Sequence, residues 1–273
     1  MRILYDNATD GAIVTASSAA LPAANLLTET KSEIWRSTAN TATLTLNWAS
    51  PRIVHCAALI FCNLTSTATI RVKGYSLTTD TVPLFDHGPF LACAYAPLGL
   101  WNWGMLPLGV NAYSYGGGTY AMLWFDGGAV EKLEIILDDT ENSMGYLESS
   151  RVVTGSYWQP SSGAQYGSTA SGVRDLSNQY RTEAGDLKTT INTNHRTLQL
   201  DCYAWNETDR SELYNILRTN ALLKPVLVSL LPGDANPVLE QSMTIYGKLV
   251  NSDAAMTAAN YGLFTAPLNI EEV

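Results

Sequence analysis

Short runs of alternating apolar and polar residues dominate the first 160 residues of the chain. Residues 42–48 alternate, with Leu44, Leu46 and Trp48 on one face, which predicts a strand with one buried side. Residues 53–61 are almost continuously apolar, and such a run predicts a strand covered on both faces. Many short strands with threonine-rich outer faces predict an antiparallel β-sandwich. Further strands are expected at 67–75 with Ala68, Ile70 and Val72 facing inward, at 121–125 and 132–137 with a turn at 126–128, and at 146–158.

The last 80 residues follow a different pattern, in which a helical period interrupts the strands. Asn206 is placed to cap a helix, with Asp209 at the third helical position. Lys224 and Pro225 end this helix, and the whole pattern predicts a small α+β domain over residues 194–273. The apolar stripe of the helix consists of Leu213, Ile216, Leu217 and Ala221, and strands are expected at 196–203, 226–231, 243–250 and 263–270.

Two segments break these periods. Residues 161–193 are rich in Ser, Gly, Thr and Asn and sustain no hydrophobic period, which predicts a linker or an extended arm. Residues 76–118 form a long insert in the sandwich, rich in glycine and aromatic residues and without Lys or Arg. An insert of this length is either a packed cover over the sandwich or a contact surface. Its candidates for sugar or protein contact are Trp101, Trp103, Tyr113 and Tyr115.

The composition of the chain argues against several classes of protein. Charged residues make up 15% of the chain, against roughly 25% in an average soluble domain. So few charges indicate limited free surface, as in an assembly subunit, and together with 46% hydrophobic residues they exclude a disordered chain. The net charge of −9 and the lack of a Lys/Arg cluster argue against nucleic-acid binding. Neither a targeting segment nor a membrane-spanning run is expected, because the longest apolar run, residues 53–64, is too short.

Candidate catalytic and metal-binding residues are sparse. A structural role is expected for His55 in its apolar run and for His87 in a turn, and His195 is expected to be solvated. Nucleotide, hydrolase and zinc-protease motifs are missing from the sequence. Asp138 and Asp139, with Glu141, could bind Ca²⁺, but a solvated turn at a strand end is favoured. We therefore expect neither an enzyme nor a metal or cofactor site.

The four cysteines are Cys56, Cys62, Cys93 and Cys202. Buried free thiols are the favoured interpretation, because buried cysteines pack as small hydrophobic residues. A disulfide and a shared metal site stay open as alternatives, although the spacings match no compact ligand pattern.

Several segments resemble discoidin-like (galactose-binding-like) jelly-roll domains. In order, they are PAANLL at 22–27, EIWRS at 33–37, LTL at 44–46, SPRIV at 50–54 and ATIRVKG at 68–74. The "NLL…WRS" stretch would enter the first core strand of such a domain, and the "SPR.V" stretch would precede the next. The resemblance implies a discoidin-like sandwich over residues 1–160. The insert at 76–118 departs from the family, so no ligand-binding residue is carried over by motif.

The rest of the chain resembles tail proteins of tailed bacteriophages. The similar segments are 145–155 with Trp158-Gln159-Pro160, and, in the C-terminal part, an "R.L.L" strand, a helix, the strand at 224–228 and the strand at 246–249. This resemblance implies a structural protein of the virion, at the tail tip or baseplate, that is assembled in the host cytoplasm. Its expected partners are other tail proteins and copies of itself in a symmetric ring, with no nucleic acid and no membrane insertion.

Two other functions are open at this stage. One is a carbohydrate-binding module that contacts host surface glycans through the aromatic residues of the insert. The other, strongly disfavoured, is a glycan hydrolase with paired carboxylates such as Asp138 and Glu141, because such enzymes need two carboxyl groups in one cleft.

Overall fold

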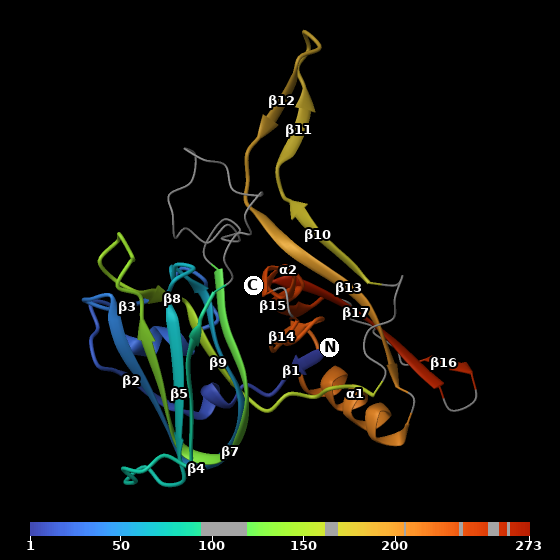
Figure 1. Ribbon diagram of the computed structural model, residues 1–273. Helices are drawn as coiled ribbons and strands as arrows, with labels where there is room; N and C mark the ends of the chain where they lie inside the picture. The colour runs from blue at the N-terminus through green and yellow to red at the C-terminus, as the bar shows by residue number, and fades with distance from the viewer. Residues whose placement is uncertain (94–118, 162–168, 205, 235–236, 251–256, 261–262) are drawn as a thin grey trace. The chain divides into compact units, whose positions relative to one another are not determined.

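Antiparallel strands make up most of the computed structural model, and helices are few (Figure 1). The expected mainly β fold class is confirmed. The structure describes residues 1–93, 119–161, 169–204, 206–234, 237–250, 257–260 and 263–273. Among them, no helix has the length and hydropathy needed to cross a membrane. The chain forms two compact units, and each unit is built from separate stretches of sequence.

The first, called here the sandwich unit, comprises residues 6–157 and 231–244. Its main sheet is a curled antiparallel sheet with the strand order β2-β4-β7-β5-β6, and β9 pairs with β4 as well. A small ladder of β3 and β8 lies beside it. The elements are η1 (Ala8–Gly11), β2 (Ile13–Ala16), η2 (Ala23–Leu27), β3 (Trp35–Arg36), β4 (Thr41–Cys62), β5 (Thr69–Tyr75), β6 (Phe85–Leu91), β7 (Thr119–Asp138), β8 (Glu148–Ser149), β9 (Arg151–Gly155) and α2 (Pro237–Ser242).

Two of these strands are longer than the sequence predicts. The expected strands at 42–48 and 53–61 are one bent strand, β4, and the expected turn at 126–128 lies inside β7. The pairing of β4 with β7 shifts register between Asn47 and Arg52, so Pro51 sits at the bend, where a strand tolerates the lack of an N–H group. Gly127 lets the two bent strands touch, because a Cβ there would lie 1.8 Å from the carbonyl oxygen of Val54.

The core of this unit follows the expected alternation. Ala68, Ile70 and Val72 are fully buried, and β4 is buried on both faces in its second half, as predicted. Leu44 and Leu46 from the first half of β4 join the same core. Because both halves of the bent strands contribute to one core, the curled sheet encloses its own hydrophobic interior.

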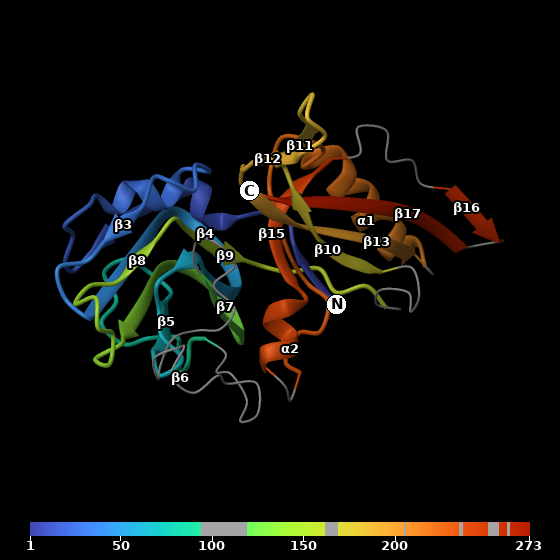
Figure 2. The same cartoon turned by 90° about the horizontal axis from the view of Figure 1, so that it is seen from above.

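The second, the arm-bearing unit, comprises residues 1–5, 158–230 and 245–273. Its sheet has the order β1-β14-β15-β17-β13-β10, with β16 added on β17. Figure 2 shows α1 beside β13, along this sheet. The elements are β1 (Arg2–Leu4), β10 (Ala170–Asp175), β11 (Asn178–Arg181), β12 (Leu187–Thr190), β13 (Asn194–Ala204), α1 (Glu207–Thr219), β14 (Val226–Ser229), β15 (Thr244–Leu249), β16 (Thr257–Asn260) and β17 (Leu263–Glu272).

Helix α1 begins where the sequence predicts, but it ends before the last residue of the predicted apolar stripe. The side chain of Asn206 accepts a hydrogen bond from the backbone N–H of Asp209, which is the expected cap. Leu213 and Ile216 are buried. The prediction that Ala221 continues the stripe is wrong, because the helix stops at Thr219 and Ala221 is exposed with a φ of 41°.

Candidate functional site

The four aromatic residues predicted to contact sugar or protein lie outside the described residues. Trp101, Trp103, Tyr113 and Tyr115 all fall within residues 94–118. Their role therefore stays a prediction. The described residues on either side, Cys93 and Thr119, are buried in the sandwich unit.

A protruding hairpin stands out in the arm-bearing unit. Strand β10 runs along the edge of β13, and the chain then continues as β11, a turn and β12 before it returns to the sheet (Figure 1). Residues 176–193, called here the arm, are all exposed except Ser177 and Thr182. The expectation of a linker or arm at 161–193 did not include strands, because the polar Ser/Thr-rich sequence has no buried face to reveal them.

The local sequence explains the hairpin turn. Gly185 has a φ of 90°, a left-handed conformation that favours glycine. The backbone N–H of Thr182 donates to the carbonyl of Asp186, and the N–H of Gly185 donates to the carbonyl of Thr182. The Arg181 guanidinium donates to the carbonyl of Gly185 at 2.8 Å. These contacts fix a defined turn at the tip of the arm.

The arm exposes large apolar side chains. The exposed fractions are 40% for Leu176, 54% for Tyr180, 55% for Leu187 and 89% for Ile191. A two-stranded hairpin without a hydrophobic partner is marginally stable at best in water. The arm therefore has the character of a segment that gains stability when another surface covers it.

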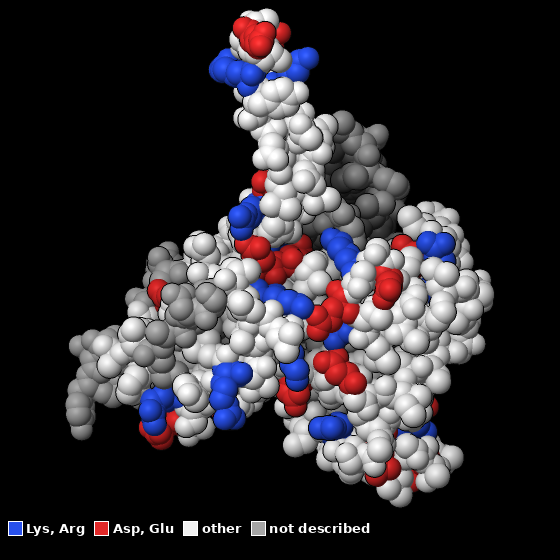
Figure 3. Space-filling view, turned by 180° about the vertical axis from the view of Figure 1, so that it is seen from behind, with Lys and Arg blue, Asp and Glu red and all other residues white. Residues whose placement is uncertain are grey.

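Charge is distributed unevenly along the arm. Its stem, residues 176–180 and 189–193, carries no charged residue. The charged residues of the arm, Arg181, Glu183, Asp186 and Lys188, gather at the tip, and Figure 3 shows the white stem below them. Depletion of charge is typical of the centre of a protein–protein interface, and charge is typical of its rim.

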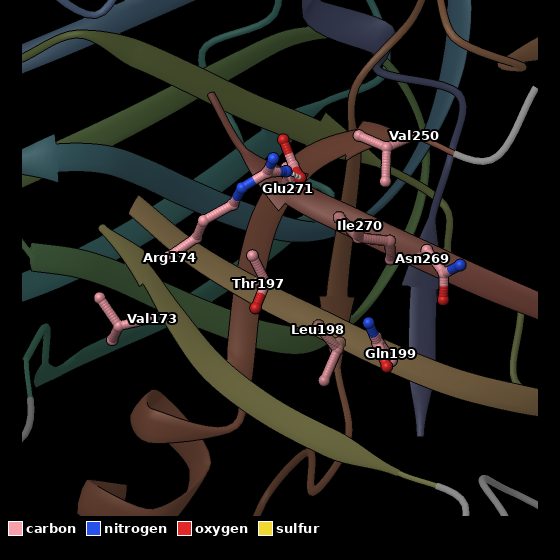
Figure 4. A pocket seen from close by; sticks show the side chains of 9 residues that line it. All are labelled: Val173, Arg174, Thr197, Leu198, Gln199, Val250, Asn269, Ile270 and Glu271. Carbon is pink, nitrogen blue, oxygen red and sulfur yellow. Dashed lines mark hydrogen bonds and ion pairs between the residues drawn. The ribbon is translucent and has the colours of Figure 1, made fainter. Parts of the chain in front are cut away.

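A shallow hollow of about 280 Å³ lies where the arm joins the sheet. Gly172 on β10 faces Thr197 on β13, and a Cβ at this glycine would lie 3.3 Å from the Thr197 hydroxyl oxygen. Figure 4 shows the lining residues, which are Val173, Arg174, Thr197, Leu198, Gln199, Val250, Asn269, Ile270 and Glu271.

Strand β10 is also the last strand of its sheet. Every residue from Ala170 to Asp175 is exposed. An exposed edge strand presents backbone N–H and carbonyl groups that can pair with another strand. The arm and this edge together form one continuous surface suited to association.

Two of the three histidines hold the bend of β7. The backbone N–H of Gly127 donates to Nδ1 of His55 at 3.1 Å, and Nε2 of His87 lies 2.8 Å from the carbonyl oxygen of Asp126. The expected structural role of His55 fits this geometry. His87 also makes a structural contact, but the expectation that it lies in a turn is wrong, because it belongs to strand β6. The expectation that His195 is solvated is wrong, because its side chain is 21% exposed and faces Glu271.

The carboxylate of Asp139 is engaged in a turn. It accepts hydrogen bonds from the backbone N–H of Thr65 at 2.9 Å, the Thr65 hydroxyl at 2.5 Å and the Asn142 amide at 3.1 Å. Asp138 and Glu141 are exposed. Within the described ranges, no three His, Cys, Asp or Glu side chains are grouped to hold a metal ion.

All four cysteines are buried and none is in a disulfide. Burial raises the pKa of the Cys202 thiol to about 12, so this thiol stays protonated at neutral pH. A protonated, buried thiol is a poor nucleophile. The favoured interpretation of the cysteines as packing residues agrees with their burial.

Comparison with known proteins gives similarity of structure only. No protein-family model matches the sequence, and no curated protein matches it. Among solved structures, a carbohydrate-binding module (CpGH89CBM32-5) from Clostridium perfringens, in complex with GalNAc-β-1,3-galactose, is 9% identical with a TM-score of 0.38. The family 32 module of C. perfringens NanJ, in complex with galactose, is 12% identical with a TM-score of 0.38. A fucose-binding module from Streptococcus pneumoniae is 9% identical with a TM-score of 0.36.

These matches cover 55%, 58% and 56% of this chain, and 100%, 100% and 99% of the respective modules. Family 32 modules have the discoidin-like fold that residues 1–160 resemble in sequence. Likeness at this identity and TM-score fixes neither a family nor a ligand for this chain. Nothing in the comparisons points to a phage tail protein.

Proposed function

We propose that this protein is a structural subunit that assembles through its arm and the adjoining β10 edge. The observation that carries the proposal is the arm itself, an exposed hairpin whose stem is free of charge and exposes three large apolar side chains. Covering Leu176, Tyr180 and Ile191 against a neighbour removes apolar surface from water, which is the main driving force of association. A repeated contact of one arm with the next copy closes into a ring when the rotation between copies allows it.

The setting we propose for this assembly is the distal tail of a tailed bacteriophage. Its support is the resemblance of residues 145–160 and of the C-terminal strands to phage tail proteins. The low content of charged residues suits a subunit whose surface is largely covered by neighbours. The partners are then copies of this chain and other tail proteins.

Removal of the arm is expected to abolish assembly without unfolding the protein. The variant replaces residues 178–191 by Asn-Gly, a two-residue connection suited to a hairpin. Because the removed side chains are exposed, the free energy of unfolding is expected to change by less than about 1 kcal/mol. Sedimentation velocity across a concentration series measures assembly, and wild-type protein is expected to form oligomers that the variant lacks.

The matched control is Leu77→Ser with Val82→Ser. These residues are 51% and 77% exposed in the loop between β5 and β6, and their replacement is expected to leave assembly unchanged. A shortened variant that assembles like wild-type protein would overturn the proposal. So would wild-type protein that stays monomeric at every concentration, alone and with purified tails.

A second candidate function is carbohydrate binding by the sandwich unit. What favours it is sequence: the stretch between Lys73 and Lys132 holds 11 of the 26 aromatic residues and 10 of the 20 glycines. Aromatic faces stack on sugar rings, and the similar structures named above include modules in complex with galactose and with GalNAc-β-1,3-galactose. Under this proposal Trp101, Trp103, Tyr113 and Tyr115 form the stacking surface.

A glycan array tests this candidate. The intact protein is expected to bind galactose- or fucose-containing glycans, and Trp101→Ala with Trp103→Ala is expected to reduce binding at least tenfold, since a stacked ring contributes about 1.5 kcal/mol. Tyr214→Ala, which replaces an exposed aromatic residue on α1 of the other unit, is the control that leaves binding intact. An empty array with wild-type protein contradicts carbohydrate binding.

A further inference from the structure

The carboxylate of Glu271 contacts both strands at the base of the arm, β10 and β13. Arg174 on β10 lies directly opposite His195 on β13. Oε1 of Glu271 on β17 lies 2.6 Å from Nη1 of Arg174, and Oε2 lies 3.5 Å from Nε2 of His195. Glu271 therefore joins both strands of the arm's root to β17. Figure 4 shows Arg174 and Glu271 side by side.

Beyond this point the arm is tied only to itself in the part of the chain that the structure describes. The backbone N–H of Leu176 donates to the carbonyl of Thr193, and the N–H of Asn192 donates to the Ser177 hydroxyl. The other side-chain hydrogen bonds of residues 176–193 also join arm residues or the neighbouring Asp175. The arm is thus held at its root, where β10 pairs with β13 and where Glu271 contacts Arg174 and His195.

We infer that Glu271 is a positioning residue for the arm, and that protonation of His195 tightens its hold. The inference rests on the proposed assembly function. Arg174, His195 and Glu271 are called the root clamp below. Histidine is the side chain that serves as a charge switch near neutral pH. The added charge turns the 3.5 Å contact of His195 with Glu271 into an ion pair.

Other charged groups face this cluster and limit the effect. Arg174 on β10 neutralises one oxygen of Glu271, and Lys248 on β15 pairs in register with Glu271. On the opposite face of the sheet, Arg196 lies 3.9 Å from Glu272. Both Arg174 and Lys248 oppose a further positive charge, whereas Oε2 of Glu271, which lies 3.5 Å from Nε2 of His195, attracts it. Attraction by this oxygen decides the sign.

Asp175 adds a constant negative charge at the root. Hydrogen bonds from the side chain and backbone of Ser177 lower the pKa of its carboxyl. Asp175 therefore stays ionised throughout the range in which histidine titrates. A response of the arm between pH 8 and pH 5 reports on His195 and not on this neighbour.

A fluorescent label at the tip measures how firmly the arm is held. The four native cysteines are buried, so a thiol-reactive dye is directed to the exposed site of Ala184→Cys. Time-resolved anisotropy on dilute, monomeric protein separates arms that swing freely from arms that tumble with the unit. The ratio of held to swinging arms is expected to rise about two- to fivefold from pH 7.5 to pH 5.5, the range for an exposed ion pair.

Variants at the root clamp separate its parts. His195→Gln is expected to keep the ratio at pH 7.5 and to lose the response to pH. Glu271→Gln is expected to lower the ratio at both values of pH. Arg174→Gln is expected to enlarge the response, since Glu271 is then shared with His195 alone. Glu207→Gln, which removes an ion pair with Arg210 on α1, is the matched control without effect.

Two results would overturn the inference: a pH response that persists in His195→Gln, and a wild-type ratio in Glu271→Gln. Because anisotropy is read on monomers, the outcome does not depend on assembly. If the arm-deletion variant assembles like wild-type protein while the pH response is intact, the proposed function is overturned and the inference about the root clamp still holds. The reverse pattern would overturn the root clamp alone.

Discussion

Gly127→Ala is expected to destabilise the sandwich unit by about 3 kcal/mol, whereas Gly128→Ala changes its stability by less than about 1 kcal/mol. At Gly127 a Cβ would lie 1.8 Å from the carbonyl oxygen of Val54, inside the van der Waals radius of a backbone atom that cannot move aside. At Gly128 the nearest group is a methyl of Leu84, at 3.5 Å. The two neighbouring glycines therefore differ in the space that is available for a Cβ atom.

Urea unfolding followed by tryptophan fluorescence measures both variants. Most of the tryptophans, including buried Trp35 and Trp48, belong to the sandwich unit, so the signal reports mainly on that unit. Equal midpoints for the two variants would show that β4 and β7 do not touch at this bend. A selective loss for Gly127→Ala supports two continuous, bent strands in place of four short ones.

Arg151→Leu is expected to cost about 3 kcal/mol of unfolding free energy. The Arg151 side chain on β9 is 4% exposed, and its guanidinium donates at 2.5 Å to the carbonyl of Leu27 and at 2.5 Å to Oδ1 of Asp10. It thus fastens η1 and η2 to the sheet. This loss is at the lower end of the range for breaking a buried ion pair. Asp10 is 45% exposed, so water can hydrate its carboxylate when Arg151 is removed.

Arg36→Leu serves as the comparison. Arg36 also pairs with a carboxylate, Oε2 of Glu148 at 2.8 Å, but its side chain is 36% exposed. Such a pair contributes at most about 1 kcal/mol. Equal losses in the two variants, measured by the same urea unfolding, would contradict the view that burial makes the Arg151 contacts important.

Local patterns in the sequence predicted the core and the helix well. The alternation at 67–75 and the run at 53–61 correspond to buried strand positions, and Asn206 caps α1 as expected. The lengths of the strands were harder to predict, because Pro51 and the glycines at 127 and 128 are typical turn residues. In this fold they sit at bends within long strands, where Pro51 lies at a register shift and Gly127 is required by the close contact with Val54.

The root clamp could not be predicted from sequence. Arg174, His195 and Glu271 are separated by up to 97 positions, and cross-strand pairing alone brings them together. The arm offered a weak local signal, the Thr-Glu-Ala-Gly-Asp stretch at 182–186, which is suited to a hairpin turn. Its stem has no apolar alternation because neither face packs on the unit.

The place of β1 sets the order in which the protein is completed during synthesis. Ile3 lies opposite Val228, and both Ile3 and Leu4 are buried to 1% exposure in the finished sheet. At about 5–20 residues per second, a ribosome needs roughly 10–45 s to make the partner strand after β1 has been made. Residues 6–157 are all made within this interval. Strand β1 is therefore made long before β14, and its pairing with that strand has to wait until residues 226–229 have been made.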